Sequence, residues 1–396
     1  MSWGLWFQVL LRGVWIHVGD GSPPIRGDVL LQGDSIAAIG LALPAPPSCL
    51  IIEASGKHLY PGLIGLGTPV GLIEIEAIRA THDEDEVGDF TPEVAAYTAF
   101  DVDSRVLPTL RANGILYVES VPKGGVIAGR AAIFRLEGRT REIAVVEPWG
   151  ALHLYPPSLR SSLYAPPEEQ DKMRRLAREK WEQLQSYLEK ARRWCRGDSS
   201  ELNIGFAAMC PYLEGKKPVV WHVEAAEDIE QALRLSLQYN LRSGIAGGSE
   251  ALKVAALLRT TGTPVILKRT HRLPPHEDAP LDYAYTLPRM LLDSGVTVML
   301  AHESFWNQRN LSYQAGTAVA YGTPPEQALA MLTSLPAQWL GLHRIGKIAI
   351  GYKASLLLCE GDLLDIPSSR ILRAWIEGKE IDLLDNPQER LYRKYR

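Results

Sequence analysis

The sequence predicts an α/β protein, with a TIM-like (β/α)8 barrel at residues 59–342 and a composite β-sandwich domain built from residues 1–58 and 343–396. Two observations carry this prediction. The middle of the chain alternates amphipathic helical patterns with short apolar strands, as a barrel of βα units does. Both ends carry alternating apolar and polar runs broken by glycine-rich turns, which is typical of antiparallel strands. The length of 396 residues allows a large barrel and a small second domain.

The terminal strands are predicted from the patterns at the two ends of the chain. In residues 7–53, short runs rich in valine, leucine and isoleucine are separated by turns that contain glycine, aspartate or proline. Residues 346–358 and 373–377 repeat this pattern near the other end. Alternation with period two and enrichment in branched aliphatic residues favour β-strands. Because strands flank the long middle on both sides, we expect the two ends to share one β-sandwich.

The middle of the chain supplies the predicted barrel strands as short apolar runs followed by helical patterns. These runs are 114–118, 219–223, 244–247, 263–267 and 295–300. The intervening helices have apolar positions at steps of three and four, which is typical of helices that pack on one side. In such a barrel the carboxyl ends of all strands lie on one rim, where active sites are built. Residues at or just after the strand ends are therefore the candidates for function.

Composition argues against several classes of function. The formal net charge of −4 is unlike that of a nucleic-acid-binding protein. No apolar run approaches the roughly 20 residues that a membrane-spanning helix needs, and the short apolar start lacks the basic segment of a signal peptide. Widely spaced cysteines without a CxxC pair predict reduced thiols. They are Cys49, Cys195, Cys210 and Cys359. We therefore expect a cytoplasmic protein with no membrane and no nucleic-acid partner.

Residues 168–195 predict one long helix, since they follow two prolines and contain no glycine or proline. Apolar residues recur along it at steps of three and four: Met173, Ala177, Trp181, Leu184, Leu188, Ala191 and Cys195. Such a stripe packs either on its own barrel, which is the commoner outcome, or on a second chain. We predict a homo-oligomer or a complex with a related chain, with Trp181 and Leu184 as the anchors of the interface.

Residues 60–72, YPGLIGLGTPVGL, resemble the first barrel strand of the amidohydrolase superfamily, where a PG-[LF]-[IV]-D-x-H-x-H segment holds two metal-binding histidines. The close of the chain is similar too, with G-x-I-x-x-G-x-x-A-x-L at residues 346–356 and W-I-E-G-K after it. The phrases GKKPVVWH, SGIAGGSEALKVAALL, GTPVILKR and LPRMLLDSGVTVML resemble strands five to eight of the imidazolonepropionase-like branch. The resemblance covers nearly the whole chain and is weakest over residues 159–214.

The resemblance implies a metal centre made by histidines on strands one, five and six, a carboxylated lysine or a glutamate on strand four, and an aspartate on strand eight. Most of these places hold residues whose side chains offer no lone pair to a metal. They are Gly67 and Pro69 on strand one, Gly247 on strand six, and Ala301 on strand eight. On strand four the place falls on Leu152 or on its neighbour His153. Only His222, on strand five, keeps a ligand type at its place.

Strands that keep their flanks but lose their ligands predict a catalytically silent protein. We expect no catalytic residues, no metal and no cofactor, with His222 as a vestigial ligand. Such a protein would serve as a structural or regulatory partner subunit, because that role needs the fold but not the chemistry.

Two alternatives stay open. His153, His222 and His302 all lie near predicted strand ends, and three imidazoles that met on the rim would satisfy zinc. The protein would then be a divergent metal-dependent hydrolase of C–N bonds in cyclic amides. Against this, His302 stands one residue beyond the aspartate place, so its side chain is expected to point to the other face of the strand. The other alternative is a protein that binds a small molecule at the barrel mouth without chemistry.

Overall fold

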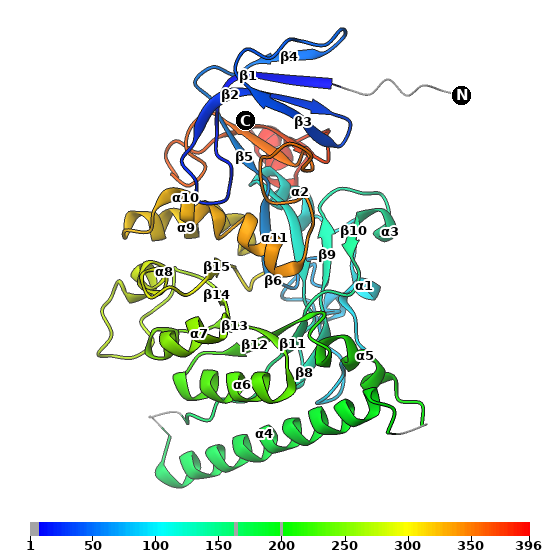
Figure 1. Ribbon diagram of the computed structural model, residues 1–396, viewed down its shortest axis with the longest axis vertical. Helices are drawn as coiled ribbons and strands as arrows, with labels where there is room; N and C mark the ends of the chain where they lie inside the picture. Colours follow the sequence, from blue (N-terminus) through cyan, green and yellow to red (C-terminus); the bar gives the residue numbers. More distant parts are fainter. Residues whose placement is uncertain (1–7, 162–164, 199–200) are drawn as a thin grey trace.

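The computed structural model describes residues 8–161, 165–198 and 201–396 (Figure 1), so the predicted first strand is described from its second residue onward. The fold is mixed α/β and contains three β-sheets. Figure 1 shows the sheet of both termini at the top and the long helix α4 (Pro167–Cys195) at the bottom. The other two sheets lie between them. The predicted α/β class is confirmed.

Strands from the two ends of the chain form one eight-stranded sheet, in the order β18-β17-β16-β5-β1-β2-β3 with β4 on β1. The strands are β1 (Gln8–Ile16), β2 (Ile25–Gln32), β3 (Ser35–Gly40), β4 (Leu50–Glu53), β5 (His58–Pro61), β16 (Leu356–Cys359), β17 (Ile371–Ile376) and β18 (Lys379–Ile381). The ends meet where β5 pairs with β16, with Tyr60 opposite Leu357. This sheet has its own apolar cluster, which includes Val14, Leu59 and Trp375. The termini therefore share a sheet, while the sandwich stays a prediction.

The middle of the chain forms two sheets, in the orders β10-β9-β7-β6 and β15-β14-β13-β12-β11-β8. Their strands are β6 (Leu63–Thr68), β7 (Ile115–Ser120), β8 (Ile127–Arg130), β9 (Ala132–Arg135), β10 (Val145–Glu147), β11 (Leu152–Leu154), β12 (Pro218–Val223), β13 (Arg242–Gly247), β14 (Val265–Leu267) and β15 (Val298–Leu300). Strands β11 to β15 are parallel and adjacent in chain order. Within the described residues no pairing joins β15 to β6. Barrel closure therefore stays a prediction.

Helices connect and cover these strands. They are α1 (Ala96–Ala99), α2 (Val106–Ala112), α3 (Arg141–Ala144), α4, α5 (Ile204–Leu213), α6 (Ala226–Tyr239), α7 (Ala255–Thr261), α8 (Tyr283–Asp293), α9 (Leu311–Ala320), α10 (Pro325–Ala330), α11 (Ser334–Leu340) and α12 (Pro387–Tyr395). Helix α6 ends because Asn240 takes a left-handed conformation with φ of 54°, which turns the chain into β13. None of the helices in the described parts of the chain is long and apolar enough to cross a membrane.

Helix α4 has the predicted length, but its apolar stripe packs inside this chain. The residues Ala177, Trp181, Leu184, Leu188 and Ala191 are buried. Trp181 stacks on Trp221 of β12 with ring centres 5.8 Å apart, and its indole donates to the Pro157 carbonyl at 2.9 Å. The prediction that Trp181 and Leu184 anchor an interface with another chain is therefore wrong. Both side chains already have their apolar partners within the fold.

The prediction of reduced cysteines is wrong for one pair, because Cys195 and Cys210 form a disulfide. Cys195 is the last residue of α4 and Cys210 lies within α5, and these two helices pack together. Their Cα atoms are 5.5 Å apart although 15 positions separate them in the sequence. Helix packing creates this proximity, which the sequence spacing does not reveal. Cys49 and Cys359 are free thiols, and burial raises the pKa of Cys359.

Candidate functional site

Strands β7, β11 and β12 bring three polar side chains into one row of contacts. Glu119 lies next to the carboxyl end of β7, His153 lies in the middle of β11, and His222 lies next to the carboxyl end of β12. His153 Nδ1 is 2.8 Å from His222 Nε2, and His153 Nε2 is 3.4 Å from Glu119 Oε1. Glu119 and His153 are buried. We call these three residues the Glu–His–His row.

The protonation of the row follows from burial and from its contacts. Burial holds the pKa of His222 well below its ordinary value, and the neighbouring His153, Lys268 and Lys123 act in the same direction. A neutral His222 has one N–H. If both rings carry the proton on Nε2, His222 donates to His153 and His153 donates to the Glu119 carboxylate. In this arrangement His222 Nδ1 is the one ring nitrogen of the two histidines without a hydrogen bond. It is buried and has no partner among the described residues.

Neighbouring groups hold the row in place. The Gly67 backbone N–H donates to Glu119 Oε2 at 3.1 Å. The Tyr155 ring stacks on the His222 ring with centres 3.9 Å apart. Burial raises the pKa of the Tyr155 phenol, which therefore stays protonated at neutral pH. The hydroxyl group of Thr68, the residue after Gly67, is also buried and has no hydrogen-bond partner among the described residues. The row is thus almost fully paired, with His222 Nδ1 as its free end.

Gly65 and Gly67 both lie on β6, the predicted first barrel strand, but their surroundings differ. A Cβ at Gly65 would lie 2.3 Å from Gln308 Nε2, and Gln308 is fully buried. The Gln308 side chain therefore occupies the space into which a larger residue at position 65 would project. A Cβ at Gly67 would meet nothing within 4 Å, but Gly67 has φ of 62°, which disfavours other residues.

The other predicted ligand places are Gly247, Pro69 and Ala301. A Cβ at Gly247 would lie 2.4 Å from Glu224 Oε1. Pro69 is buried directly after β6, and Ala301 is buried directly after β15. The Ala301 backbone N–H donates to the Leu267 carbonyl at 2.8 Å. These places keep their strand ends but bring no donor side chain.

His302 does not belong to the Glu–His–His row. Its Nδ1 accepts the Ser304 backbone N–H at 3.1 Å, and burial lowers its pKa. The charged groups that act on it are Glu303, Arg269 and His271. Of the three histidines considered for a rebuilt site, His153 and His222 therefore meet and His302 has separate partners.

Glu119 is the residue that the sequence prediction missed. It stands in the run Ile115–Ser120, where four apolar residues precede it, and the whole strand is buried. An ionisable residue inside a buried strand needs a partner, so its presence there is the signal of a polar site. The partner, His153, lies on β11 and could not be assigned without the strand arrangement.

The residues do not fit the implied metal centre. Two nitrogen ligands of a tetrahedral zinc lie about 3.3 Å apart, given Zn–N bonds of about 2.05 Å. The facing nitrogens of His153 and His222 are closer, at 2.8 Å, and share a hydrogen. Within the part of the chain that the structure describes, no three histidine, cysteine, aspartate or glutamate side chains are placed to hold a metal ion.

A polar pocket of about 340 Å³ opens beside His222. Residues after β11, β12 and β13 line it, among them Arg160, Glu224 and Glu250. Arg160 forms a bidentate pair with Glu250 at 2.7 and 2.8 Å, and Lys253 Nζ adds a contact at 2.8 Å. The hydrogen bond from Arg160 lowers the pKa of Glu250 to about 2. The charges of this pocket are therefore largely paired with one another.

Residues 281–382 match the family described as the amidohydrolase family. The structure is similar to that of an amidohydrolase from Thermotoga maritima MSB8, with a TM-score of 0.81 and 22% identity over 94% of this chain and 99% of that chain. The protein has an amidohydrolase fold. The predicted resemblance to the amidohydrolase superfamily is confirmed, and at this identity the structural likeness concerns the fold alone.

Three further proteins are similar to this chain. Molinate hydrolase has a TM-score of 0.60 at 13% identity and covers 97% of this chain and 96% of its own. Amidohydrolase tasK of Hapsidospora irregularis is 21% identical over 89% of this chain and 39% of its own length. Adenine deaminase of Deinococcus radiodurans is 41% identical over 64 residues, 16% of this chain and 11% of that protein. This chain thus spans less than half the length of tasK and of the adenine deaminase.

Proposed function

We propose that the protein is a catalytically silent amidohydrolase-like protein that acts as a structural or regulatory partner subunit. The observation that supports this most directly is the 2.8 Å contact between His153 Nδ1 and His222 Nε2. Metal-dependent hydrolysis needs a bound cation that lowers the pKa of a water molecule. The one histidine left at a ligand place instead uses its facing nitrogen on a second histidine. We accordingly propose that the chain holds no resident metal or cofactor.

We also propose the finer architecture predicted from the sequence. Strands β6, β7 and β11 to β15 would be seven of the eight strands of a TIM-like (β/α)8 barrel over residues 59–342. The parallel order of β11 to β15 supports this. Among the described residues, no strand pairing joins the sheet of β6 and β7 to the sheet of β11 to β15. The terminal sheet would be one layer of a composite sandwich over residues 1–58 and 343–396.

A second candidate function is hydrolysis of C–N bonds in cyclic amides with a rebuilt zinc site. The observation that favours it is the buried Nδ1 of His222, which has no hydrogen-bond partner among the described residues. The other nitrogen of His222 contacts His153, which in turn contacts Glu119. Short segments of the chain also match proteins named adenine deaminase and dihydroorotase. Zinc binding would require His153 and His222 to turn away from each other, because their facing nitrogens are too close to share the ion.

Titration of zinc into metal-free protein, followed by calorimetry, separates the two candidates. The silent protein is expected to show no stoichiometric site tighter than about 1 μM. A tighter site that is lost in His222→Ala would favour the hydrolase. The matched control is His343→Ala, because His343 is exposed and outside the row. A site that survives in both variants would lie elsewhere and would leave no role for His222 in metal binding.

The partner role implies a homo-oligomer or a complex with a related chain in the cytoplasm. Because the stripe of α4 is buried, another surface must carry the contact. Large apolar side chains are exposed on neighbouring strands of the terminal sheet, namely Trp15, Ile25, Leu50 and Ile51. Light scattering is expected to give a dimer or larger species for wild type and a monomer for Ile25→Glu/Ile51→Glu. A wild-type monomer that co-purifies with no other chain would contradict the partner role.

A further inference from the structure

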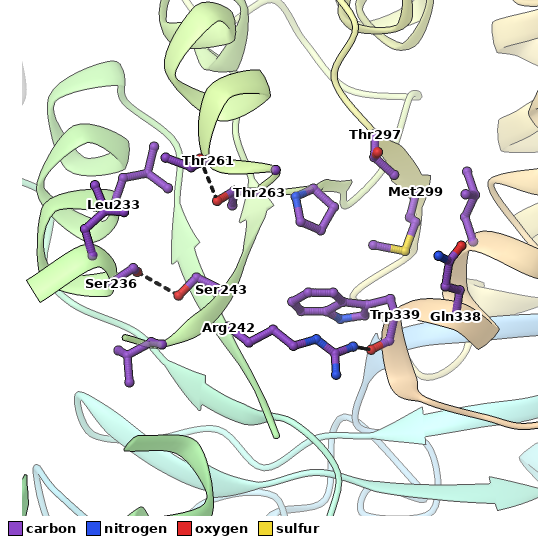
Figure 2. A pocket seen from close by; sticks show the side chains of 15 residues that line it. Leu233, Ser236, Arg242, Ser243, Thr261, Thr263, Thr297, Met299, Gln338 and Trp339 are labelled. Atoms are coloured by element: carbon purple, nitrogen blue, oxygen red, sulfur yellow. Dashed lines mark hydrogen bonds between the residues drawn. The ribbon is translucent and has the colours of Figure 1, made fainter. Parts of the chain in front are cut away.

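A second pocket, of about 550 Å³, opens at the starts of β13 to β15 (Figure 2). The polar pocket lies at the other end of the strands, since its residues follow β11, β12 and β13. Arg242 and Ser243 begin β13, Thr263 comes shortly before β14, and Thr297 directly precedes β15. His222 lies instead near the carboxyl end of β12. We call this cavity the base pocket. Its volume is within the range of about 300–1,000 Å³ that is usual for small-molecule sites.

The base pocket contains a cation, Arg242, that no acidic group among the described residues neutralises. Arg242 is partly buried and donates a hydrogen bond to the backbone carbonyl of Trp339. Its guanidinium also lies 5.1 Å from the centre of the Trp339 ring. Among the described residues, no acidic side chain acts on Arg242, and burial lowers its pKa. A partly buried charge without a counter-ion is costly, so an anion at this place would be stabilising.

A second donor in the same wall, the indole N–H of Trp339, has no hydrogen-bond acceptor among the described residues. Trp339 is 7% exposed, and its indole Nε1 is buried without a hydrogen-bond acceptor. Gly244 permits this position of the ring, because a Cβ there would lie 2.8 Å from Trp339 Cζ2. Figure 2 shows the indole ring of Trp339 among the residues that line the pocket, with Arg242 beside it. Buried N–H groups are nearly always paired, so this unpaired one is costly.

The remaining walls combine apolar side chains with polar ones, and some of the polar side chains are paired with each other. Leu233, Leu237 and Met299 provide apolar surface, and the exposed side chain of Leu237 stands at the edge of the pocket. The hydroxyl groups of Ser236 and Ser243 bond to each other at 2.7 Å, as Figure 2 shows. Arg242, which has no acidic partner among the described residues, therefore lines a pocket that also offers apolar surface.

We propose that the base pocket binds a small organic anion, in which a carboxylate or phosphate group is joined to an apolar ring. The anionic group accepts hydrogen bonds from the Arg242 guanidinium, while the ring contacts Leu233 and Met299. This inference does not depend on whether the protein has a metal or an activity, since it concerns the other end of the strands.

Calorimetric titration of the full chain with four probes tests the proposal. Phenylacetate and phenyl phosphate carry both features, phenylacetamide lacks the charge, and inorganic phosphate lacks the ring. At least one of the first two probes is expected to bind at least about tenfold more tightly than phenylacetamide and inorganic phosphate. The stronger of the two identifies the preferred anionic group. Binding of neither ring-bearing anion, or equal binding of inorganic phosphate, would overturn the proposal.

Two variants connect the binding to this pocket. Arg242→Gln is expected to weaken binding of the preferred probe at least about tenfold, because it removes the charge. The matched control Arg234→Gln changes an exposed arginine of α6 and is expected to leave the affinity unchanged. If Arg242→Gln is unstable, Thr297→Phe obstructs the pocket from an exposed position and is expected to abolish binding. Undiminished binding in folded Arg242→Gln or in Thr297→Phe would overturn the proposal.

Discussion

Charged groups are paired differently at the two ends of strands β11 to β15. We call the carboxyl ends of these strands, beside the polar pocket, the mouth, and their starts, beside the base pocket, the base. At the mouth, Arg160 and Lys253 pair with Glu250, and the Glu–His–His row connects most of its polar atoms to one another. At the base, Arg242 has no acidic partner among the described residues, and the Trp339 indole N–H has no acceptor. In a (β/α)8 barrel, active sites are built at the carboxyl ends of the strands.

This difference indicates where the protein is complete and where it is not. Polar groups that are paired within the chain stabilise the folded state, and separating them is costly. Polar groups that are buried without partners are destabilising unless a ligand pairs with them. We therefore expect substitutions at the mouth mainly to change stability and substitutions at the base mainly to change binding.

The largest effect is expected from Glu119→Leu, which breaks the row at its buried carboxylate. The substitution leaves the Gly67 N–H and the His153 Nε2–H without an acceptor in a buried site. We expect a loss of about 3 kcal/mol in the free energy of unfolding, measured by denaturant titration. Glu230→Gln, at an exposed position of α6, is the control and should change it by less than about 0.5 kcal/mol. A small effect of Glu119→Leu would mean that the row is not a paired unit.

A pair of glycine substitutions sharpens the picture of the former ligand strand. Gly65→Ala forces the buried side chain of Gln308 to move and is expected to cost about 2 kcal/mol. Gly67→Ala meets no neighbour but has an unfavourable φ, and is expected to cost about 1 kcal/mol. Adding Gln308→Ala should reduce the additional cost of Gly65→Ala, as a double-mutant cycle of unfolding free energies would measure. Additive costs would show that Gln308 does not occupy that space.

The pH dependence of stability tests the neutral state of His222. Its pKa in the folded state is below the unfolded value of about 6.5, so the unfolded chain takes up the proton first as the pH falls. Stability that needs neutral His222 is therefore present above about pH 6.5 and is lost as the pH falls from there toward the folded pKa. Wild type should lose up to about 1.4 kcal/mol per pH unit more than His222→Gln in that range.

Thermal melts of both proteins across that range provide the measurement. At pH 7, His222→Gln itself should cost only about 1–2 kcal/mol, because it removes one hydrogen-bonded imidazole from the end of the row. Parallel pH profiles for the two proteins would show that His222 is not held neutral by the fold.

The smallest effects are expected from a matched pair of arginine substitutions at the two ends. Arg160→Gln removes a bidentate partner from the buried Glu250 carboxylate, and because half of the Arg160 side chain is exposed we expect a cost of about 1 kcal/mol. Arg242→Gln removes a charge without an acidic partner and should change stability by less than about 0.5 kcal/mol. Chemical denaturation of both variants makes the comparison. A larger loss for Arg242→Gln would contradict the contrast between the two ends.

The parts of the fold that could be predicted are those that local patterns determine. Period-two alternation located the terminal strands, and an uninterrupted stretch of helix-forming residues located α4 within one residue of its start. The fate of the apolar stripe of α4 could not be predicted, because a stripe looks the same whether Trp181 packs on Trp221 or on a second chain. The Cys195–Cys210 disulfide was missed for a similar reason, since it depends on how α4 and α5 pack.

The candidate site divides in the same way. That Gly67, Pro69, Gly247 and Ala301 bring no ligands is a property of residue type, so it could be read from the sequence. The pairing of His153 with His222 depends on the adjacency of β11 and β12, and the role of Glu119 depends on β7 lying beside them. The base pocket lies at the strand starts, where no motif drew attention to Arg242.

Elemental analysis of the protein, purified without chelator and dialysed, tests the central claim most directly. The account predicts less than about 0.1 zinc, manganese or iron per chain, because the row pairs its histidines with each other and the other ligand places hold no donors. About one metal per chain that survives dialysis in wild type and in His343→Ala, but disappears in His222→Ala, would contradict it.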